Sequence, residues 1–164
     1  MDRLGDVSLF FDFFVASQRL RRALSEALEP AGMRPDEYAV YSALFEGGPI
    51  TASSMAEALG MPLTTVLEYL KAMNAAGHIV RTAHPFDGRA VEISLNRSGV
   101  AAHRRAHARW DLIRRRIEAE LDVPLPQVRR SIQALGAATG RASGPARERR
   151  PDVLHEATRS RPRR

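Results

Sequence analysis

Apolar residues recur every three or four positions in six stretches of the chain, and they alternate with polar residues in two shorter stretches. The first spacing predicts amphipathic helices, and the second predicts strands with one buried face. We therefore expect helices over about residues 7–29, 35–47, 51–59, 62–76, 97–121 and 125–138. Strands are expected over residues 78–82 and 91–95, and the Pro and Asp-Gly between them predict a tight hairpin. The fold class expected is mainly α with a small β-hairpin.

The residues at the helix ends support these boundaries. The side-chain oxygens of Thr51 and Asn96 suit helix N-caps. Gly60 and Gly77 directly follow two helices, where a left-handed glycine commonly ends the helix. Two short helices joined by a glycine-centred turn and followed by a hairpin predict a winged helix-turn-helix over residues 35–96. The buried face expected for its second helix consists of Leu63, Val66, Leu67, Leu70 and Met73.

The outer helices carry longer apolar stripes than a small winged domain needs. Four phenylalanines near the start of the first helix exceed the needs of one packing face: Phe10, Phe11, Phe13 and Phe14. Such stripes must be buried somewhere, either by a second chain or by ends that fold back on the winged domain. A two-fold dimer with interlaced terminal helices is the more economical solution. We expect residues 1–34 and 97–140 to form a helical dimerisation region.

The positive charge of the chain is concentrated in its C-terminal part. The formal net charge is +6 and the pI is about 10.8, which favours a nucleic-acid partner. Residues 1–96 nevertheless hold eight Lys or Arg against twelve Asp or Glu, whereas residues 97–164 hold seventeen against seven. Residues 141–164 combine eight arginines with Pro, Ser and Ala, so we expect a basic disordered tail. This tail is either a polyanion-binding segment or a merely solvated end.

Several classes of protein are disfavoured by the composition. The chain has no cysteine, which excludes disulfides and thiolate chemistry. No apolar run approaches the ~20 residues of a membrane span, and the Phe-rich start lacks the positive charge of a secretory signal. We therefore expect a cytoplasmic protein without membrane contact. Because there is no glycine-rich phosphate loop, nucleophile–base arrangement or metal cluster, we expect neither an enzyme nor a cofactor.

The hairpin carries the most specific pattern in the sequence, DGRAVEISLN. It resembles the wing of the MarR family of bacterial transcriptional regulators, in which Asp-x-Arg is followed after five residues by Leu-Thr. Asp87, Arg89 and Leu95 match this pattern, and Asn96 replaces the Thr with another side chain that caps helices. The resemblance extends from the first expected helix to the last. It implies a homodimer that binds palindromic double-stranded DNA and often responds to a small aromatic acid or phenol.

A helix-turn-helix contacts DNA bases through the N-terminal part of its second helix. The outward positions of that helix are Thr64, Thr65, Glu68, Tyr69 and Lys71. Thr can bond several bases, and Glu can accept a hydrogen bond from cytosine. Ser53 and Ser54 begin the preceding helix and are candidates for phosphate contact. Arg81 lies in the wing, and the resemblance implies that Arg89 enters a minor groove while Asp87 fixes its direction. The alternative is an exposed hairpin ion pair without DNA contact.

The predicted reading head is acidic. Residues 36–77 contain five acidic residues and one basic residue, Lys71, which gives a net charge of −4. Because phosphate neutralisation supplies most non-specific DNA affinity, this charge is unfavourable for DNA binding. The leading hypothesis is a ligand-responsive, homodimeric DNA-binding regulator that acts as a repressor. The alternative is a winged-helix protein that has lost specific operator binding and acts as a protein-interaction or small-molecule-sequestering module.

The resemblance also implies an effector pocket between the winged domain and the dimer helices. The candidate ligand-binding residues on those helices are Phe14, Arg19, Tyr38, Tyr41, His107 and Trp110. An arginine beside aromatic rings suits a planar carboxylate, although each residue alone also suits an ordinary core or surface position. His103 and His107 stand four positions apart on one helix, a spacing that can bind a metal ion. No third ligand stands out, so we expect no metal site.

Overall fold

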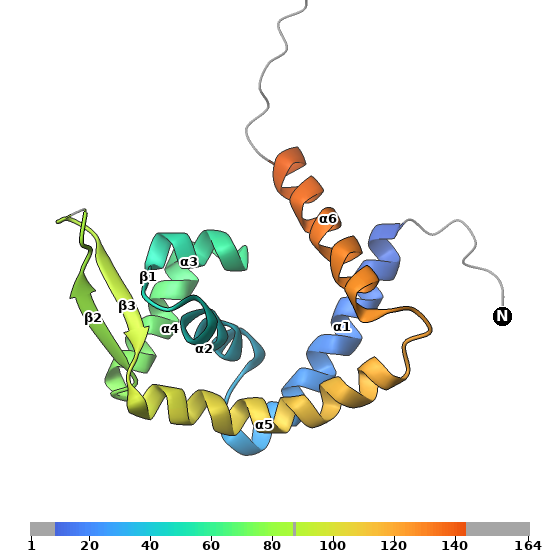
Figure 1. The fold of residues 1–164 in the computed structure, drawn as a ribbon, viewed down its shortest axis with the longest axis horizontal. Coiled ribbons are helices and arrows are strands. Elements are labelled where there is room, and N and C mark those ends of the chain that lie inside the picture. The colour runs from blue at the N-terminus through green and yellow to red at the C-terminus, as the bar shows by residue number, and fades with distance from the viewer. Residues whose placement is uncertain (1–8, 87, 144–164) are drawn as a thin grey trace, which may run out of the picture. The chain divides into compact units, whose positions relative to one another are not determined.

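The computed structural model describes residues 9–86 and 88–143 (Figure 1), and the chain divides into two compact units after Glu120. The helices of the first unit are α1 (Leu9–Leu28), the short 3-10 helix η1 (Glu29–Ala31), α2 (Pro35–Gly47), α3 (Ala52–Leu59), α4 (Leu63–Ala75) and α5 (Arg97–Ala119). Its strands are β1 (Ile50–Thr51), β2 (Ile79–Ala83) and β3 (Val91–Leu95). The second unit contains α6 (Leu125–Ser143). The predicted fold class, mainly α with a winged helix-turn-helix, is confirmed.

The helix ends form as their residue types predict. The Thr51 hydroxyl accepts a hydrogen bond of 3.2 Å from the backbone N–H of Ser54 and so caps α3. Asn96 caps α5 in the same way, because its Oδ1 accepts from the Gly99 N–H at 3.0 Å. Gly60 ends α3 with a φ of +62°, a left-handed conformation that glycine adopts without strain. These local signals place α4 directly after a tight turn, as a helix-turn-helix requires.

The sheet is antiparallel, with the strand order β1-β3-β2. β2 and β3 form the predicted hairpin, with Ile79 opposite Leu95. The strand β1 is an addition that the pattern did not predict, and its Ile50 lies opposite Ile93 of β3. Two residues are too few to show an alternation of apolar and polar positions, so no periodic signal marks this strand. β2 also begins one residue later than predicted and continues to Ala83.

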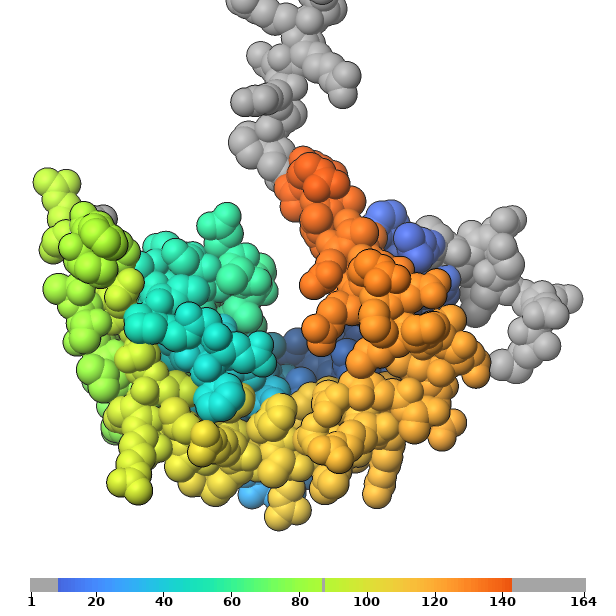
Figure 2. All heavy atoms as spheres, in the orientation of Figure 1, coloured from blue at the N-terminus to red at the C-terminus, as the bar shows by residue number. Residues whose placement is uncertain are grey.

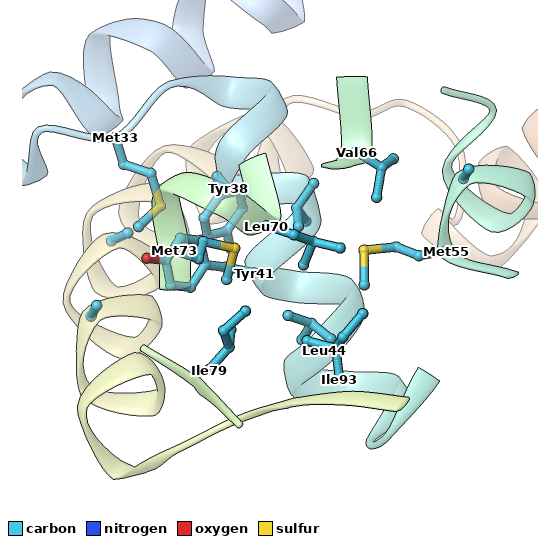
Figure 3. Packing of buried hydrophobic residues seen from close by; sticks show 14 of the residues in the cluster. Met33, Tyr38, Tyr41, Leu44, Met55, Val66, Leu70, Met73, Ile79 and Ile93 are labelled. Atoms are coloured by element: carbon cyan, nitrogen blue, oxygen red, sulfur yellow. The ribbon is translucent and has the colours of Figure 1, made fainter. Parts of the chain in front are cut away.

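The core of the first unit gathers side chains from α1, α2, α3, α4, α5 and the sheet, and many of them are shown in Figure 3. Its largest fully buried side chains are Leu28, Val40, Met55, Val66, Leu70 and Met73. Full burial of an aliphatic or methionine side chain stabilises the fold by about 1.5–3 kcal/mol relative to exposure. The core therefore fixes α4 and the base of the wing to α2, and this leaves the outer side of α4 free for other contacts.

The prediction that Leu63 and Leu67 belong to the buried face of α4 is wrong. These side chains are 42% and 48% exposed, whereas Val66, Leu70 and Met73 are buried. The buried positions form one narrow stripe at helical spacing, and positions 63 and 67 lie at its edge. Leu67 instead lines a groove between α4 and the wing. Apolar character alone could not separate the core face of α4 from a groove beside it.

The apolar residues of α1 divide according to their position along the helix. Leu28 at the C-terminal end is fully buried, and Leu24 packs against the core. Phe10, Phe13 and Phe14 near the other end are exposed. α1 packs against α5 and α2, so its C-terminal end is held by the first unit. Its N-terminal end presents an apolar surface to solvent in the single chain.

α6 is longer than the sequence pattern predicts, since it ends at Ser143 rather than near residue 138. The Thr139 hydroxyl donates a hydrogen bond of 2.9 Å to the Leu135 carbonyl, and Arg141 lies in the last turn, where a cation favours the helix dipole. The helix therefore includes the first residues assigned to the basic tail, whose remainder, residues 144–164, lies outside the described residues. Across residues 9–86 and 88–143, none of the helices combines the length and apolar composition that crossing a bilayer requires.

Candidate nucleic-acid interface and effector cluster

The outer side of α4 presents the polar residues expected of a recognition helix. Thr64, Glu68 and Lys71 are exposed, whereas Thr65 and Tyr69 are half-buried. The exposed side chains offer hydroxyl, carboxylate and ammonium groups on one helix, which is a mixture of donors and acceptors. Such a surface can read base edges in a major groove.

Tyr69 lies between the surface and the core. Its ring packs against the core, and the guanidinium carbon of Arg34 lies 5.6 Å from the ring centroid. This distance is within the range of a cation–π contact. Arg34 precedes α2 and was not among the predicted site residues, because sequence spacing gives no sign that it lies against α4. It places one positive charge beside the otherwise acidic head.

A groove of about 610 Å³ separates α3 and α4 from the wing. Ser53 of α3, Arg81 of β2 and Arg89 near the wing tip line this groove, together with Leu67 of α4. The structure therefore brings Ser53 of α3 to the same groove as the two arginines of the wing. Ser54 is exposed beside Ser53, and its hydroxyl accepts a hydrogen bond from Thr51. The predicted partner of Arg89, Asp87, lies outside the described residues.

Tyr38 and His107, two of the predicted effector residues, meet between α2 and α5. The Tyr38 hydroxyl and the His107 Nδ1 share a hydrogen bond of 2.8 Å. The Tyr38 ring also stacks on His103, with 5.4 Å between ring centroids. His103 is only 2% exposed, and its Nε2 shares a hydrogen bond of 3.1 Å with the Ser42 hydroxyl. Phe45 stacks on His103 at 4.4 Å, so the cluster is a column of aromatic rings.

Burial sets the protonation of this cluster and of the neighbouring Tyr41. It raises the pKa of Tyr38, and together with nearby Glu37 it raises the pKa of Tyr41 to about 12. Burial also lowers the pKa of His103 below its ordinary value, and the neighbouring His107 adds to this effect. Both phenols therefore remain protonated and His103 remains uncharged near neutral pH. The cluster can offer neutral hydrogen-bonding groups and flat ring faces to a ligand.

The other predicted effector residues are not shown to contact Tyr38 or His107. Trp110 packs against the core on α5, whereas Phe14 and Arg19 are exposed on α1. Tyr41 turns away from the cluster, because its hydroxyl shares a hydrogen bond of 2.5 Å with His78 at the base of the wing. Ser42, Phe45 and His78 were missed by the sequence reasoning. The contacts of His103 with α2 had no signal in the sequence either.

The two histidines of α5 use their ring nitrogens for hydrogen bonds to α2. His103 bonds through Nε2 to Ser42, and His107 bonds through Nδ1 to Tyr38. Their rings are stacked, with centroids 5.6 Å apart. Within residues 9–86 and 88–143, no group of three or more His, Cys, Asp or Glu side chains could hold a metal ion.

Solved structures provide the comparison with known proteins. The DNA complex of MosR from M. tuberculosis is 26% identical over 83% of this chain and 98% of its own, with a TM-score of 0.69. CouR from Rhodococcus jostii RHA1, bound to p-coumaroyl-CoA, is 21% identical over 84% and 95%, with a TM-score of 0.70. Apo MarR from E. coli is 20% identical over 80% and 97%, with a TM-score of 0.64. No family profile and no curated protein sequence matches the chain.

The fold and its neighbours define the class of this protein as a winged-helix transcriptional regulator. The structural neighbours include a MarR-family regulator, and the chain shares their fold, which agrees with the resemblance inferred from its wing. The compared proteins are regulators rather than enzymes, which agrees with the expectation for this chain.

Proposed function

We propose that this chain is a homodimeric, ligand-responsive repressor that binds a palindromic operator in double-stranded DNA. The observation that carries the proposal is the groove beside the polar helix α4, which Ser53, Arg81 and Arg89 line. Arginine suits phosphate and minor-groove contacts, and the exposed residues of α4 suit base edges. The crystal structures of MosR and of a MarR variant, each in complex with DNA, support this assignment.

The dimer part of the proposal rests on the exposed end of α1. Phe10, Phe13 and Phe14 form an apolar surface that a second copy of the chain would cover. A two-fold dimer would present two α4 helices to successive major grooves, which matches a palindromic operator. Light scattering of the full chain should give the mass of two subunits. Phe14→Glu should reduce it to the mass of one, and a wild-type chain with the mass of one subunit would contradict the dimer.

The effector part rests on the cluster between α2 and α5. Tyr38, His107 and Trp110 supply aromatic ring faces and hydrogen-bonding groups that suit a small aromatic acid or phenol. The complex of CouR with p-coumaroyl-CoA supports a small-molecule effector in a protein of this fold. A panel of aromatic acids and phenols should contain compounds that raise the melting temperature of the chain and weaken its DNA binding. A panel without such compounds would remove this part of the proposal.

The central experiment measures DNA binding by the full chain across salt concentrations. The probes are duplexes from the DNA that flanks its own coding region, with shuffled duplexes of equal composition for comparison. Affinity should be higher for one flanking duplex and should fall steeply with salt, because phosphate contacts release counterions. Arg89→Ala should weaken binding and reduce the salt slope by about 1. Arg22→Ala is the matched control, because Arg22 is an exposed arginine on α1 that pairs with Glu26.

The second candidate function is a winged-helix module that has lost specific operator reading. The observation that favours it is the net charge of −4 over residues 36–77, with Glu57 and Glu68 both exposed on the head. Under this alternative, flanking and shuffled duplexes bind equally at every salt concentration. A clear preference for one flanking duplex would exclude it. Expression of a reporter from that duplex should then rise when the chain is deleted, as a repressor requires.

A further inference from the structure

Phe86 has the highest exposure among the large apolar residues that the structure describes. Its side chain is 94% exposed and lies in the connection between β2 and β3, at the tip of the wing. In Figure 2 this hairpin extends beyond the helices of the head. A single exposed apolar residue is common on protein surfaces and needs no function. Phe86 differs from such residues because hydrogen bonds fix the backbone of the turn that carries it.

The turn around Phe86 is built by its own hydrogen bonds. The Phe86 backbone N–H donates to Nδ1 of His84 at 3.2 Å, and the two rings form an edge contact with centroids 6.2 Å apart. Nε2 of His84 lies 3.6 Å from a carboxylate oxygen of Glu92 on β3. The backbone N–H of His84 donates a hydrogen bond of 3.0 Å to the Ala90 carbonyl and so closes the hairpin. His84 therefore links the Phe86 backbone to the body of the wing.

This arrangement prepares the aromatic ring for contact with a partner. A ring that is already held in one turn loses less conformational entropy on binding than a ring on a loose loop. Arg89 lies on the same short connection and is also exposed. If Arg89 enters a narrow minor groove, as the proposed function holds, then the ring of Phe86 is carried to the same groove.

We propose that Phe86 is an apolar wedge that enters the minor groove of the bound duplex and partly opens one base step. The proposal rests on the proposed DNA-binding function and adds a residue that shapes its specificity. Phenylalanine is among the side chains that proteins insert between base steps from the minor groove, and such insertion kinks the duplex. Pyrimidine–purine steps unstack most easily, so the wedge favours operators with such a step under each wing.

The test uses the full chain and a duplex that the wild-type chain selects from a random-sequence library. The duplex carries a fluorophore at each end, so that energy transfer reports its bend. Phe86→Ala should weaken binding about tenfold, as expected for the loss of one buried aromatic contact. It should also return the bend toward that of free DNA and leave the salt slope unchanged, because the ring contacts no phosphate. Phe86→Leu should retain most of the affinity and the bend.

The matched control is Val80→Ala, which removes an exposed apolar side chain from β2 away from the wing tip. It should change neither affinity nor bend. All variants should melt at the wild-type temperature, because the altered side chains are exposed. If Phe86→Ala bends the selected duplex as strongly as the wild-type chain does, the wedge is overturned while the DNA-binding function stands. If the wild-type chain selects no sequence, the proposed function itself fails and the wedge fails with it.

Discussion

Two histidines of this chain organise their surroundings in opposite ways. His103 is buried between α2 and α5, where its ring stacks on Tyr38 and Phe45 and so joins elements distant in sequence. His84 is half-buried near the wing tip, where it holds the backbone of its close neighbour Phe86. The same side chain thus stabilises the interior in one region and shapes a contact surface in the other. Changes around His103 should therefore affect stability, and changes around His84 should affect binding.

The largest change in stability is expected at Gly99, in the part of α5 that lies against the base of the wing. A Cβ atom at Gly99 would lie 2.2 Å from the His78 carbonyl oxygen and 3.0 Å from the Leu95 side chain. The first contact involves backbone, so α5 would have to shift away from the base of the wing. We expect Gly99→Ala to lower the free energy of unfolding by about 2–3 kcal/mol, as other overpacked sites do. Chemical denaturation of the full chain measures this change.

The same substitution elsewhere provides the control. Gly136 lies in α6, and apart from its chain neighbours and the surrounding helix backbone no atom lies within 4 Å of the position that its Cβ would take. Alanine is the better helix former, so Gly136→Ala should raise the free energy of unfolding by about 0.5–1 kcal/mol. A Gly99→Ala chain as stable as the wild type would show that α5 does not pack tightly on the wing base.

The second effect is a dependence of stability on pH that arises from His103. Its pKa lies below the ordinary value of 6.5 because burial and His107 disfavour its charge, with Arg104 acting in the same direction and Glu46 against it. Below pH 6.5 the unfolded chain therefore binds a proton that the folded chain resists. This contribution to stability is complete above pH 6.5 and is lost as the pH falls toward the folded pKa, by at most about 1.4 kcal/mol per pH unit.

Melting curves of wild type and His103→Phe across this pH range provide the measurement. The Phe ring can keep the stacking on Tyr38 and Phe45 but loses the hydrogen bond to Ser42. The comparison therefore uses the slope with pH rather than the absolute stability. His103→Phe should flatten the slope below pH 6.5. An equal slope in both chains would show that a group other than His103 binds the proton that makes stability depend on pH.

The contrast between the two regions also shows which features a sequence can reveal. The caps by Thr51 and Asn96 act within three residues, so residue type and spacing were sufficient to predict them. The wing was predicted because its pattern is local as well. The hydrogen bond between Tyr41 and His78 joins α2 to the base of the wing and has no local signal. Leu67 was misassigned because its exposure depends on the groove between α4 and the wing.

The third effect compares the two tyrosine hydroxyls of α2. Tyr38→Phe removes the hydrogen bond to His107, and Tyr41→Phe removes the hydrogen bond to His78. Each loss should lower the free energy of unfolding by about 1 kcal/mol. The loss at Tyr41 should be the larger, because its side chain is more deeply buried. Urea denaturation measures the free energy of unfolding of each variant. The double variant Tyr38→Phe with His107→Gln should be little less stable than Tyr38→Phe alone. Additive losses would show that this pair does not interact.

The smallest effect on stability is expected at His84, where the effect on DNA should be clear. His84→Ala removes the acceptor of the Phe86 N–H and the group facing Glu92, both at the surface of the wing. The free energy of unfolding should change by less than about 0.5 kcal/mol, as is usual for surface sites. The bend of the selected duplex should fall to between the values for wild type and Phe86→Ala, because the ring remains but is no longer held. Thr82→Ala, an exposed position on β2, should change neither quantity. If His84→Ala unfolds the chain and leaves the bend intact, the wing histidine acts as His103 does and the division between the two regions is wrong.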